Sequence, residues 1–382
     1  MKKSILVFNG YYLPAQKYGG PTTSLVSIVE NCSEKFQFYI VAANHDLNEK
    51  KKFEGIKKGW NNVGKAKVLY IDLKEINYNS PNINKLLKII KPDMVWLVGI
   101  LVPADKWFVA RQCRKLHIPY LISPRGEVCE NTFHLKYKKK KIVSEIANVL
   151  NVYKDAYFHA TSNEEKEGLI KYYNASPERI FLVPNIAANL KAYDRSIEKK
   201  KNSLRIVFIS RIQEKKNLLL AIKAVNKLDG DIVFDIFGPM ESKEYWKLCQ
   251  EEILKSSENI HIEYKGALKT RDVSTTFKNY HCFLFPTISE NYGHVIVEAL
   301  ASSVPIILSK GTTPWDDIDG KAGKICKLEV VEQFSDALRT LVEMNQSEYN
   351  NLLDSTAKYY NSKIQEDDAV NGHIKMLERI TD

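Results

Sequence analysis

Long apolar runs are absent from this sequence of 382 residues. No stretch approaches the ~18 consecutive apolar residues that predict a membrane-spanning helix. The first residues, MKKSILVFNGYYLP, hold only a short apolar run with no small-residue cleavage site after it, which favours a β-strand over a secretory signal. We therefore expect neither a spanning segment nor a secretory signal in this sequence.

Paired cysteines are also missing, because none of the six cysteines stands in a C-x-x-C arrangement. With 44% apolar residues, a chain of this length can build its cores without disulfides. We expect buried, unpaired thiols and a reducing, cytoplasmic compartment. The cysteines are Cys32, Cys113, Cys129, Cys249, Cys282 and Cys326.

The sequence has no zinc-finger spacing, no RNP-like aromatic pattern and no basic region beside heptads, so nucleic acid ranks last among possible partners. What it does have is an excess of positive charge, a net +10 with a pI near 9.0. A phosphorylated substrate and an anionic membrane surface are the partners that suit this charge better.

Short apolar strands alternate with helices in two series, which predicts an α/β protein of two doubly wound, Rossmann-like domains. The first series covers residues 1–190 and the second residues 204–364, with a polar linker at 191–203. The strands are apolar on both faces, as buried parallel strands are. They are expected at 4–10, 36–44, 66–72, 94–100, 119–124, 156–162, 179–185, 204–210, 231–238, 260–266, 282–287 and 305–309.

Two glutamates mark the strongest candidate site. Glu290 and Glu298 stand eight residues apart, across the expected start of a helix that follows the strand at 282–287. Eight helical residues span ~12 Å, more than the ~5–9.5 Å between the carboxylates of a glycosidase. The spacing instead suits a long ligand with a diol near each end and a phosphate at the helix N-terminus beside Gly293, as in a nucleotide sugar.

Two further features follow strands, where ligands of such sheets bind in a cleft at the carboxyl ends. Arg211 and Lys216 precede a helix that Asn217 can cap, and two cations there suit a diphosphate. Gly19 and Gly20 precede a proline and form a candidate anion or substrate loop. Taken alone, each of these features is more typical of an exposed turn or helix start.

Taken in order, the features resemble the retaining glycosyltransferases of the GT-B fold, specifically family 4. The resemblance covers essentially the whole chain and rests on the glycine pair, on S-R-x4-K and on E-x-Y-G-x4-E. HATSNEEKEGLI, VPNIAAN, IFGP and YKGAL are similar to further motifs of that family. TPWDDI and SPRGEV resemble a subgroup that builds surface polysaccharides, including lipopolysaccharide and O-antigen.

The resemblance implies roles for individual positions. Arg211 and Lys216 would hold the diphosphate of a UDP- or GDP-linked sugar, Glu298 would bind the ribose hydroxyls, and Glu290 would contact the transferred sugar. The other implied positions are Tyr292, Gly293 and His294 through their backbone N–H groups, Gly238, Pro239 and Gly266 near the base, and Gly19 and Gly20 lining the cleft.

The resemblance also implies transfer with retention to a glycan or lipid-linked glycan acceptor, and a last helix at 365–382 that packs back on the first domain. Growing charge on the departing diphosphate would be stabilised by the two cations. One alternative is a nucleotide-sugar epimerase or hydrolase of the same fold, for which no set of acid and base side chains is visible. Another is a non-catalytic scaffold, against which the retained charged residues argue.

The sequence departs from the family at three places. Asn217 stands where a glycine is common after the lysine. Arg125 stands where many members carry His or Asp, and the cation suits either a leaving-group phosphate or an acceptor phosphate. The segment VPNIAAN lacks the Gly and Asp that usually follow its Asn185.

No metal or other cofactor is expected. The two D-x-D sequences, Asp229–Asp231 and Asp317–Asp319, lie in predicted turns and are interpreted as solvated. Arg211 and Lys216 would supply the positive charge that a metal otherwise brings.

The segment HLKYKKKKIVSEIANVL, residues 134–150, combines a lysine cluster with apolar residues at near-helical spacing. This pattern is typical both of a helix that docks on an anionic membrane and of a buried helix with a solvated basic start. The lysines are Lys136, Lys138, Lys139, Lys140 and Lys141, expected to precede the helix.

Overall fold

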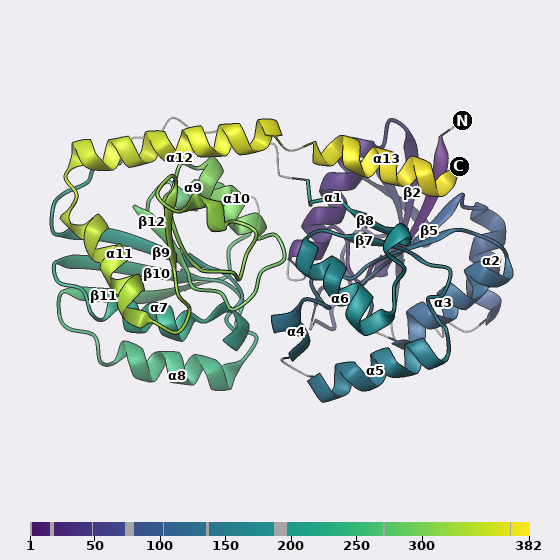
Figure 1. Ribbon diagram of the computed structural model, residues 1–382, viewed down its shortest axis with the longest axis horizontal. Helices are drawn as coiled ribbons and strands as arrows, with labels where there is room; N and C mark the ends of the chain where they lie inside the picture. Colours follow the sequence, from purple (N-terminus) through teal and green to yellow (C-terminus); the bar gives the residue numbers. More distant parts are fainter. Residues whose placement is uncertain are drawn as a thin grey trace. The chain divides into compact units, whose positions relative to one another are not determined.

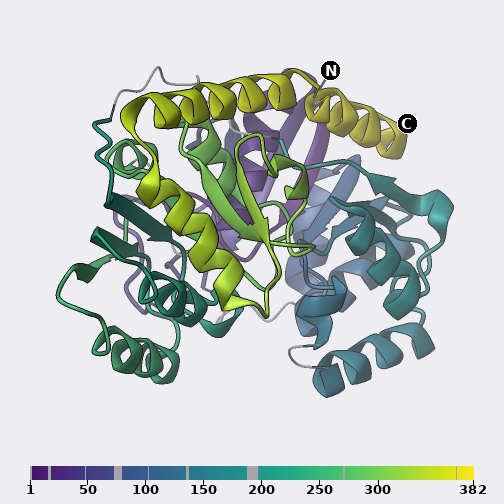
Figure 2. The ribbon, with the colours of Figure 1, turned by 60° about the vertical axis from the view of Figure 1, so that its left-hand side comes forward.

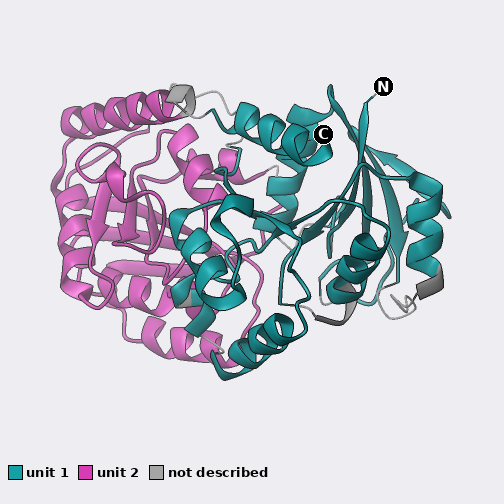
Figure 3. Ribbon diagram, turned by 45° about the vertical axis from the view of Figure 1, so that its right-hand side comes forward, with its two compact units in different colours: residues 1–186, 368–382 teal, residues 187–367 magenta. Residues whose placement is uncertain are grey.

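The computed structural model describes residues 2–15, 19–47, 49–72, 80–101, 103–134, 137–186, 197–269, 272–366 and 368–382. The chain forms two compact units, Met1–Ile186 with Asp368–Asp382, and Ala187–Asp367, which Figure 3 distinguishes by colour. Each unit is a mainly parallel sheet covered by helices.

Over its described residues, the first unit holds an eight-stranded sheet of order β3-β4-β2-β1-β5-β6-β7-β8, parallel except for the antiparallel pair β3–β4. Its strands are β1 (Lys3–Phe8), β2 (Phe36–Ala43), β3 (Trp60–Val63), β4 (Ala66–Ile71), β5 (Met94–Val98), β6 (Tyr120–Ser123), β7 (Tyr157–Ala160) and β8 (Ile180–Leu182). Its helices are α1 (Gly20–Cys32), α2 (Ser80–Ile90), α3 (Pro103–Lys115), α4 (Glu130–His134), α5 (Tyr137–Val149), α6 (Asn163–Tyr173), the single turn η1 (Pro177–Arg179) and α13 (Ala369–Thr381).

The second unit holds, over its described residues, a parallel six-stranded sheet of order β11-β10-β9-β12-β13-β14. Its strands are β9 (Ser203–Ile209), β10 (Asp231–Phe237), β11 (Ile260–Gly266), β12 (Cys282–Phe285), β13 (Ile306–Ser309) and β14 (Gly323–Cys326). Its helices are α7 (Leu218–Val225), α8 (Lys243–Ile253), α9 (Val273–Phe277), α10 (His294–Ala301), α11 (Val331–Glu343) and α12 (Gln346–Glu366), with the single turns η2 (Glu214–Lys216) and η4 (Asp316–Ile318).

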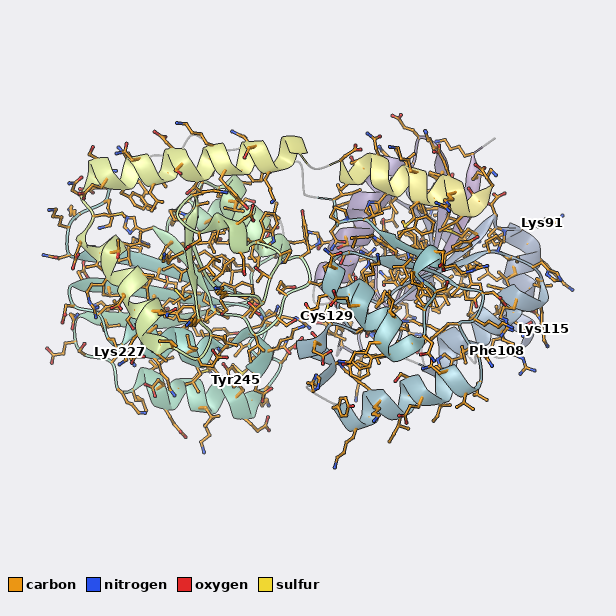
Figure 4. The ribbon with its side chains drawn as sticks, in the orientation of Figure 1. Lys91, Phe108, Lys115, Cys129, Lys227 and Tyr245 are labelled. Carbon is orange, nitrogen blue, oxygen red and sulfur yellow. The ribbon has the colours of Figure 1, made fainter. Side chains whose placement is uncertain are left out.

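Central strands are buried on both faces, as the apolar runs predicted. No residue of β5 is more than 2% exposed, and β12 and β13 are fully buried as well. Helices cover these faces through side chains such as Tyr245 of α8, labelled in Figure 4, whose hydroxyl accepts from the Leu219 N–H of α7 at 2.9 Å. In the second unit α12 packs along α10, as Figures 1 and 2 both show.

The predicted fold class of two Rossmann-like domains is confirmed, while some element bounds were wrong. The strand β3 was missed because its residues, WNNV, are mostly polar, and it adds an antiparallel edge to a sheet expected to be parallel. From the sequence KIVSEIANVLNVYKDA we also expect a helix at 141–156, but the helix ends at Val149, close to Asn151, whose φ of 48° is incompatible with a right-handed helix.

The cysteines are all buried and unpaired, as the sequence predicted. No helix among the described residues is long and apolar enough to cross a membrane.

The C-terminal helix α13 belongs to the first unit although it follows the second in sequence. It packs along α1, and Lys35 pairs with Glu378 at 2.7 Å. Lys3 at the start of β1 donates to the Thr381 carbonyl at 2.6 Å. The expected helix at 365–382 differs from the observed one at its start. Residues 365–366 form the end of α12, Asp367 lies outside the described residues, and α13 begins at Ala369.

Residues 197–203, expected to be part of a linker, are packed onto the second unit; the linker residues 191–196 lie outside the described ones. Lys199 is only 3% exposed. Its ammonium donates to the carbonyls of Lys200, Val342 and Met344 at 2.6, 3.3 and 3.0 Å, and so caps the C-terminus of α11. Burial lowers the pKa of this amine.

Replacing this buried cap should destabilise the second unit. Lys199→Met keeps the apolar stem but removes one donor from each of three carbonyls, of which those of Val342 and Lys200 keep the N–H groups of Asn202 and Ser203. We expect a loss of about 2 kcal/mol in the free energy of unfolding, measured in urea. Lys201→Met, at an exposed neighbouring position, is the matched control and should change stability by less than ~0.5 kcal/mol. Equal stabilities of the two variants would show that the cap contributes nothing.

Candidate functional site

The carboxyl ends of β9, β10 and β11 are joined backbone to backbone. The Gly238 N–H donates to the Gly266 carbonyl at 2.9 Å, and the Ile212 N–H to the Pro239 carbonyl at 2.9 Å. A Cβ at Gly238 would lie 1.8 Å from the Ser210 carbonyl oxygen, so only glycine fits there. The three positions implied for the nucleotide base, Gly238, Pro239 and Gly266, therefore share one edge of the sheet.

Lys216 ends the single turn η2, which directly follows the β9 loop. Its ammonium forms an ion pair with the Glu290 carboxylate and lies 5.3 Å from the centroid of the Phe285 ring at the end of β12. The lysine side chain is almost fully buried. The next residue, Asn217, has a φ of 56°, which explains why an asparagine replaces the family's glycine. Its side chain makes no capping hydrogen bond to α7, contrary to the sequence-based expectation.

Backbone hydrogen bonds fix the loops that carry this ion pair. The Ile288 N–H donates to the Lys215 carbonyl at 2.9 Å, and the Thr287 hydroxyl donates to the same oxygen at 3.2 Å. The Glu290 N–H donates to the Thr312 carbonyl at 2.7 Å. The loop after β12 is thus held by the loops after β9 and β13.

The charge state of Glu290 follows from its surroundings. Burial by itself raises the pKa of this carboxyl, but the ion pair with Lys216, aided by Lys215 and Arg211, outweighs burial and holds the pKa below its usual range. Glu290 is therefore an anion at neutral pH. As a carboxylate it can accept hydrogen bonds but has no proton to donate.

Gly293 makes the turn that starts α10. It has a φ of 79°, and a Cβ there would lie 2.6 Å from Cδ1 of Ile296. Because glycine has no side chain, the backbone can turn directly into the helix, and helix N-termini of this kind can bind anions through their first N–H groups. The flanking residues Tyr292 and His294 stack edge to face, with ring centroids 5.0 Å apart.

Glu298 lies one turn further along α10 and has a different environment. Burial raises the pKa of its carboxyl to about 7. Among the described residues, none pairs with this carboxylate or hydrogen-bonds it. A half-buried carboxylate without protein partners is a ready acceptor for two hydroxyls of a ligand, such as those of a ribose.

Arg211 is paired differently from Lys216. Its guanidinium donates to the Glu241 carboxylate at 2.8 Å, and the side chain is more than one third exposed. Sequence reasoning missed Glu241, which follows β10, because the contact joins residues 30 positions apart. The ion pair keeps the arginine at the strand ends, within electrostatic reach of Glu290.

Trp315 is a second residue whose role the sequence did not reveal. The indole N–H donates to the Tyr292 carbonyl, and the two rings lie 5.7 Å apart between centroids. The tryptophan is buried and supports the loop that carries Glu290 and Gly293 from behind. The TPWDDI motif pointed to this residue, but it does not indicate which residue Trp315 contacts.

The first unit holds the other predicted positions. Gly19, with a φ of 70°, is the N-cap of α1, and its carbonyl accepts from the N–H groups of Thr22 and Thr23 at 3.1 and 3.2 Å. Gly20 is the first, exposed residue of that helix. Arg125 follows β6 and has a φ of 55°.

The two D-x-D sequences differ from each other. Asp231 is the first residue of β10 and so lies at the amino end of the strand, whereas the candidate site lies at the carboxyl ends. Asp317 is not simply solvated, as was predicted, because it accepts from the Tyr359 hydroxyl at 2.9 Å and from Lys363 at 2.8 Å. Within the described part of the chain, no group of three or more His, Cys, Asp or Glu side chains is arranged to hold a metal ion.

Comparison with known proteins finds a family likeness over the second unit. Residues 191–359 match the model of the family described as glycosyl transferases group 1. Over 159 residues the chain is 30% identical to the GtfA subunit of a UDP-N-acetylglucosamine–peptide N-acetylglucosaminyltransferase of Streptococcus agalactiae, covering 40% of this chain and 30% of that one. The chain spans less than half the length of several curated relatives that it matches.

Solved structures extend the likeness to the whole chain. Anabaena Alr3699/HepE in complex with UDP-glucose superposes with a TM-score of 0.74 at 14% identity, covering 99% of both chains. WaaG, a glycosyltransferase involved in lipopolysaccharide biosynthesis, gives 0.68 at 13% identity, also with 99% of both chains covered. At these identities the likeness establishes the fold, which is GT-B.

Ionisation of Glu298 should make the ligand-free protein less stable as pH rises. A pKa raised in the folded state stabilises the fold below the unfolded pKa of ~4.5, and this stabilisation is lost as pH rises through about 7. Between pH 5 and pH 8, wild type should lose about 2.5 kcal/mol of unfolding free energy relative to Glu298→Gln, measured by urea unfolding at both pH values.

The control for this measurement is Glu343→Gln, an exposed glutamate at the end of α11. Its difference from wild type should not change with pH. A Glu298→Gln difference that is equally flat would mean that Glu298 titrates as an ordinary exposed carboxylate.

Proposed function

We propose that this protein is a retaining glycosyltransferase of family 4 that transfers a sugar from a UDP- or GDP-linked donor to a glycan or lipid-linked glycan acceptor. The observation that carries the proposal is the ion pair between the buried Lys216 and the partly buried Glu290 at the carboxyl edge of the second sheet. Around it lie Arg211, the N-terminus of α10 and the unpartnered carboxylate of Glu298. The UDP-glucose bound by Alr3699/HepE supports a donor of this class.

The donor would lie along this edge of the sheet. Its diphosphate would contact Lys216, Arg211 and the first N–H groups of α10 beside Gly293. Glu298 would accept from the ribose diol and Glu290 from hydroxyls of the transferred sugar. Each polar part of a nucleotide sugar then has a matching group in the second unit.

The reaction that these groups favour is breakage of the bond between the sugar and the diphosphate. Negative charge grows on the departing oxygen as that bond breaks, and fixed cations stabilise the charge most in the transition state. The departing phosphate would accept the proton of the acceptor hydroxyl on the same face, which gives retention. With Lys216 and Arg211 in these positions, the proposal needs no metal ion.

The same proposal places the enzyme in bacterial surface polysaccharide synthesis, including lipopolysaccharide and O-antigen. The motifs TPWDDI and SPRGEV and the likeness to WaaG support this assignment. An epimerase or hydrolase of the same fold is less well supported, because the ionised Glu290 and the lysine beside it offer no neutral acid next to the sugar.

We also propose that α5 of the first unit docks on the anionic inner face of a membrane. Lys138 to Lys141 lie within the first turns of α5 rather than before it, which corrects the sequence-based expectation, and Lys136 lies outside the described residues. Lys138, Lys139 and Lys141 are exposed. Lys140 instead turns inward, donating to the Thr132 carbonyl at 2.5 Å and lying over the Phe133 ring.

The apolar residues of this helix argue against the alternative of a buried helix. Ser144 and Ala147 form its buried side. Four apolar side chains of this segment are between 44% and 79% exposed: Ile142, Ile146, Val149 and, just after the helix, Leu150. An outward apolar face behind exposed lysines suits a membrane surface, where apolar side chains enter the headgroup region and each lysine contributes ~1 kcal/mol.

The donor proposal is tested by thermal unfolding with UDP, GDP, ADP, CMP and their common sugars. A donor at ~100 times its dissociation constant should add ~2.7 kcal/mol, which shifts the melting temperature by roughly 5–10 °C. The shift should be lost in Lys216→Ala and in Glu298→Ala. In wild type the shift should persist when EDTA is added. Lys223→Ala and Glu343→Ala, exposed residues of α7 and α11, should keep it. No shift with any compound would refute the donor assignment.

The membrane proposal is tested by pelleting with vesicles. Wild type should bind vesicles containing phosphatidylglycerol more strongly than pure phosphatidylcholine vesicles. Ile142→Ser with Ile146→Ser should lower the bound fraction at least ~5-fold, since two apolar side chains lose their buried area. Leu248→Ser with Leu254→Ser, two exposed leucines of the second unit, is the matched control. Binding independent of anionic lipid would count against docking.

A further inference from the structure

Arg125 of the first unit is a partly buried residue whose guanidinium forms no ion pair, although two of its nitrogens are fully buried. No carboxylate of the described residues lies within ion-pairing distance of its guanidinium, and burial lowers its pKa to about 10. The buried Glu165 is nearby, but it accepts from the N–H groups of Gly126 and Thr161 and from the Thr161 hydroxyl. A buried, unpaired guanidinium is costly unless something supplies the missing partner.

The nitrogens that lack partners form one edge of the guanidinium. Nε and Nη2 of Arg125 are both buried and make no hydrogen bond, while Nη1 donates to Oδ1 of Asn185 at 2.6 Å. In arginine, the N–H groups of Nε and Nη2 point the same way and form the parallel pair that binds two oxygens of a phosphate or carboxylate. The guanidinium of Arg125 is called the fork below. Its Nη1 is hydrogen-bonded, whereas the bidentate edge formed by Nε and Nη2 has no partner.

The surroundings hold this fork in one orientation. Asn185, which accepts from Nη1, is itself buried. The guanidinium lies 5.9 Å from the centroid of the Trp96 ring, and that ring is fixed by a 2.8 Å hydrogen bond from its N–H to the Ser123 hydroxyl. Arg125 and Gly126 both have positive φ values, of 55° and 83°. A left-handed arginine is uncommon and is kept where the surroundings determine it, often at a functional site.

The position of the fork also indicates a ligand site. Arg125 follows β6, Thr161 follows β7 and Asn185 follows β8, so all three lie at the carboxyl edge of the first sheet. Ligands of such sheets bind at this edge. Asn9, which follows β1 at the same edge, has a buried Oδ1 that also lacks a partner.

We propose that Arg125 binds an oxyanion of the acceptor substrate, a phosphate or a carboxylate, through its Nε and Nη2 edge. This inference rests on the proposed function, because it describes the acceptor of that transfer. The donor diphosphate is assigned to Lys216 and Arg211 of the second unit, so the fork of the first unit serves a different anion. Asn185 acts as a positioning residue that sets the direction of the fork.

The test titrates the full-length protein with methyl phosphate and, separately, with acetate, by calorimetry in saturating nucleotide so that the cations of the second unit are occupied. One of the two anions should bind wild type, and Arg125→Lys, which keeps the charge but not the fork, should weaken that binding at least ~10-fold. Nucleotide affinity should change less than twofold. Arg179→Lys, a stacked arginine of the same unit, is the matched control and should bind like wild type.

Three results would overturn the inference: neither anion binds, Arg125→Lys binds the anion as wild type does, or Arg125→Lys loses nucleotide binding too, which would assign the fork to the donor. If Arg125→Lys does not fold, Asn185→Ala is used instead and should weaken the anion at least ~3-fold. If no nucleotide binds, the transferase proposal fails by itself, and the titration without nucleotide still tests the oxyanion site.

Discussion

The ion pair between Lys216 and Glu290 is the contact on which the candidate donor site depends. It joins the loop after β9 to the loop after β12, two neighbouring strands of the second sheet. A buried ammonium in this position would be costly alone, and the partly buried carboxylate beside it compensates its charge before any ligand binds. The backbone bonds around them, from Ile288 to Lys215 and from Glu290 to Thr312, keep both side chains in reach of each other.

The fold could be predicted from the sequence because its strands are apolar on both faces and alternate with helices. Where that signal weakens, the prediction failed. The polar strand β3 has no such pattern, and residues 197–203 look like a charged linker although Lys199 is buried. In both cases a contact with a distant segment, β4 or the end of α11, determines the structure rather than the local sequence.

The candidate site follows the same rule: residues with a local sequence signal could be predicted, and residues that act through distant contacts could not. Spacing alone brought attention to Lys216, Glu290, Gly293 and Glu298, because these residues flank strand ends and a helix start. Their ligand roles stay predictions. Glu241 and Trp315 could not be found that way, since each acts through a residue more than 20 positions away in sequence. The fork of Arg125 shows only in the structure, because a sequence reveals a cation but not which of its nitrogens are already bonded.

Both cations of the candidate donor site already have carboxylate partners, and this has a consequence for the proposed catalysis. Lys216 pairs with Glu290 and Arg211 with Glu241, so the ligand-free site is close to electrically neutral. A ground-state diphosphate therefore gains less from these cations than it would from unpaired ones, which limits tight binding of donor and product alike. The pairing also fixes where the cations stand, so little reorganisation is needed when charge grows on the departing phosphate. Because the paired carboxylates weaken the attraction for a phosphate in the ground state and in the transition state alike, the advantage of such a site for the proposed reaction is this low reorganisation.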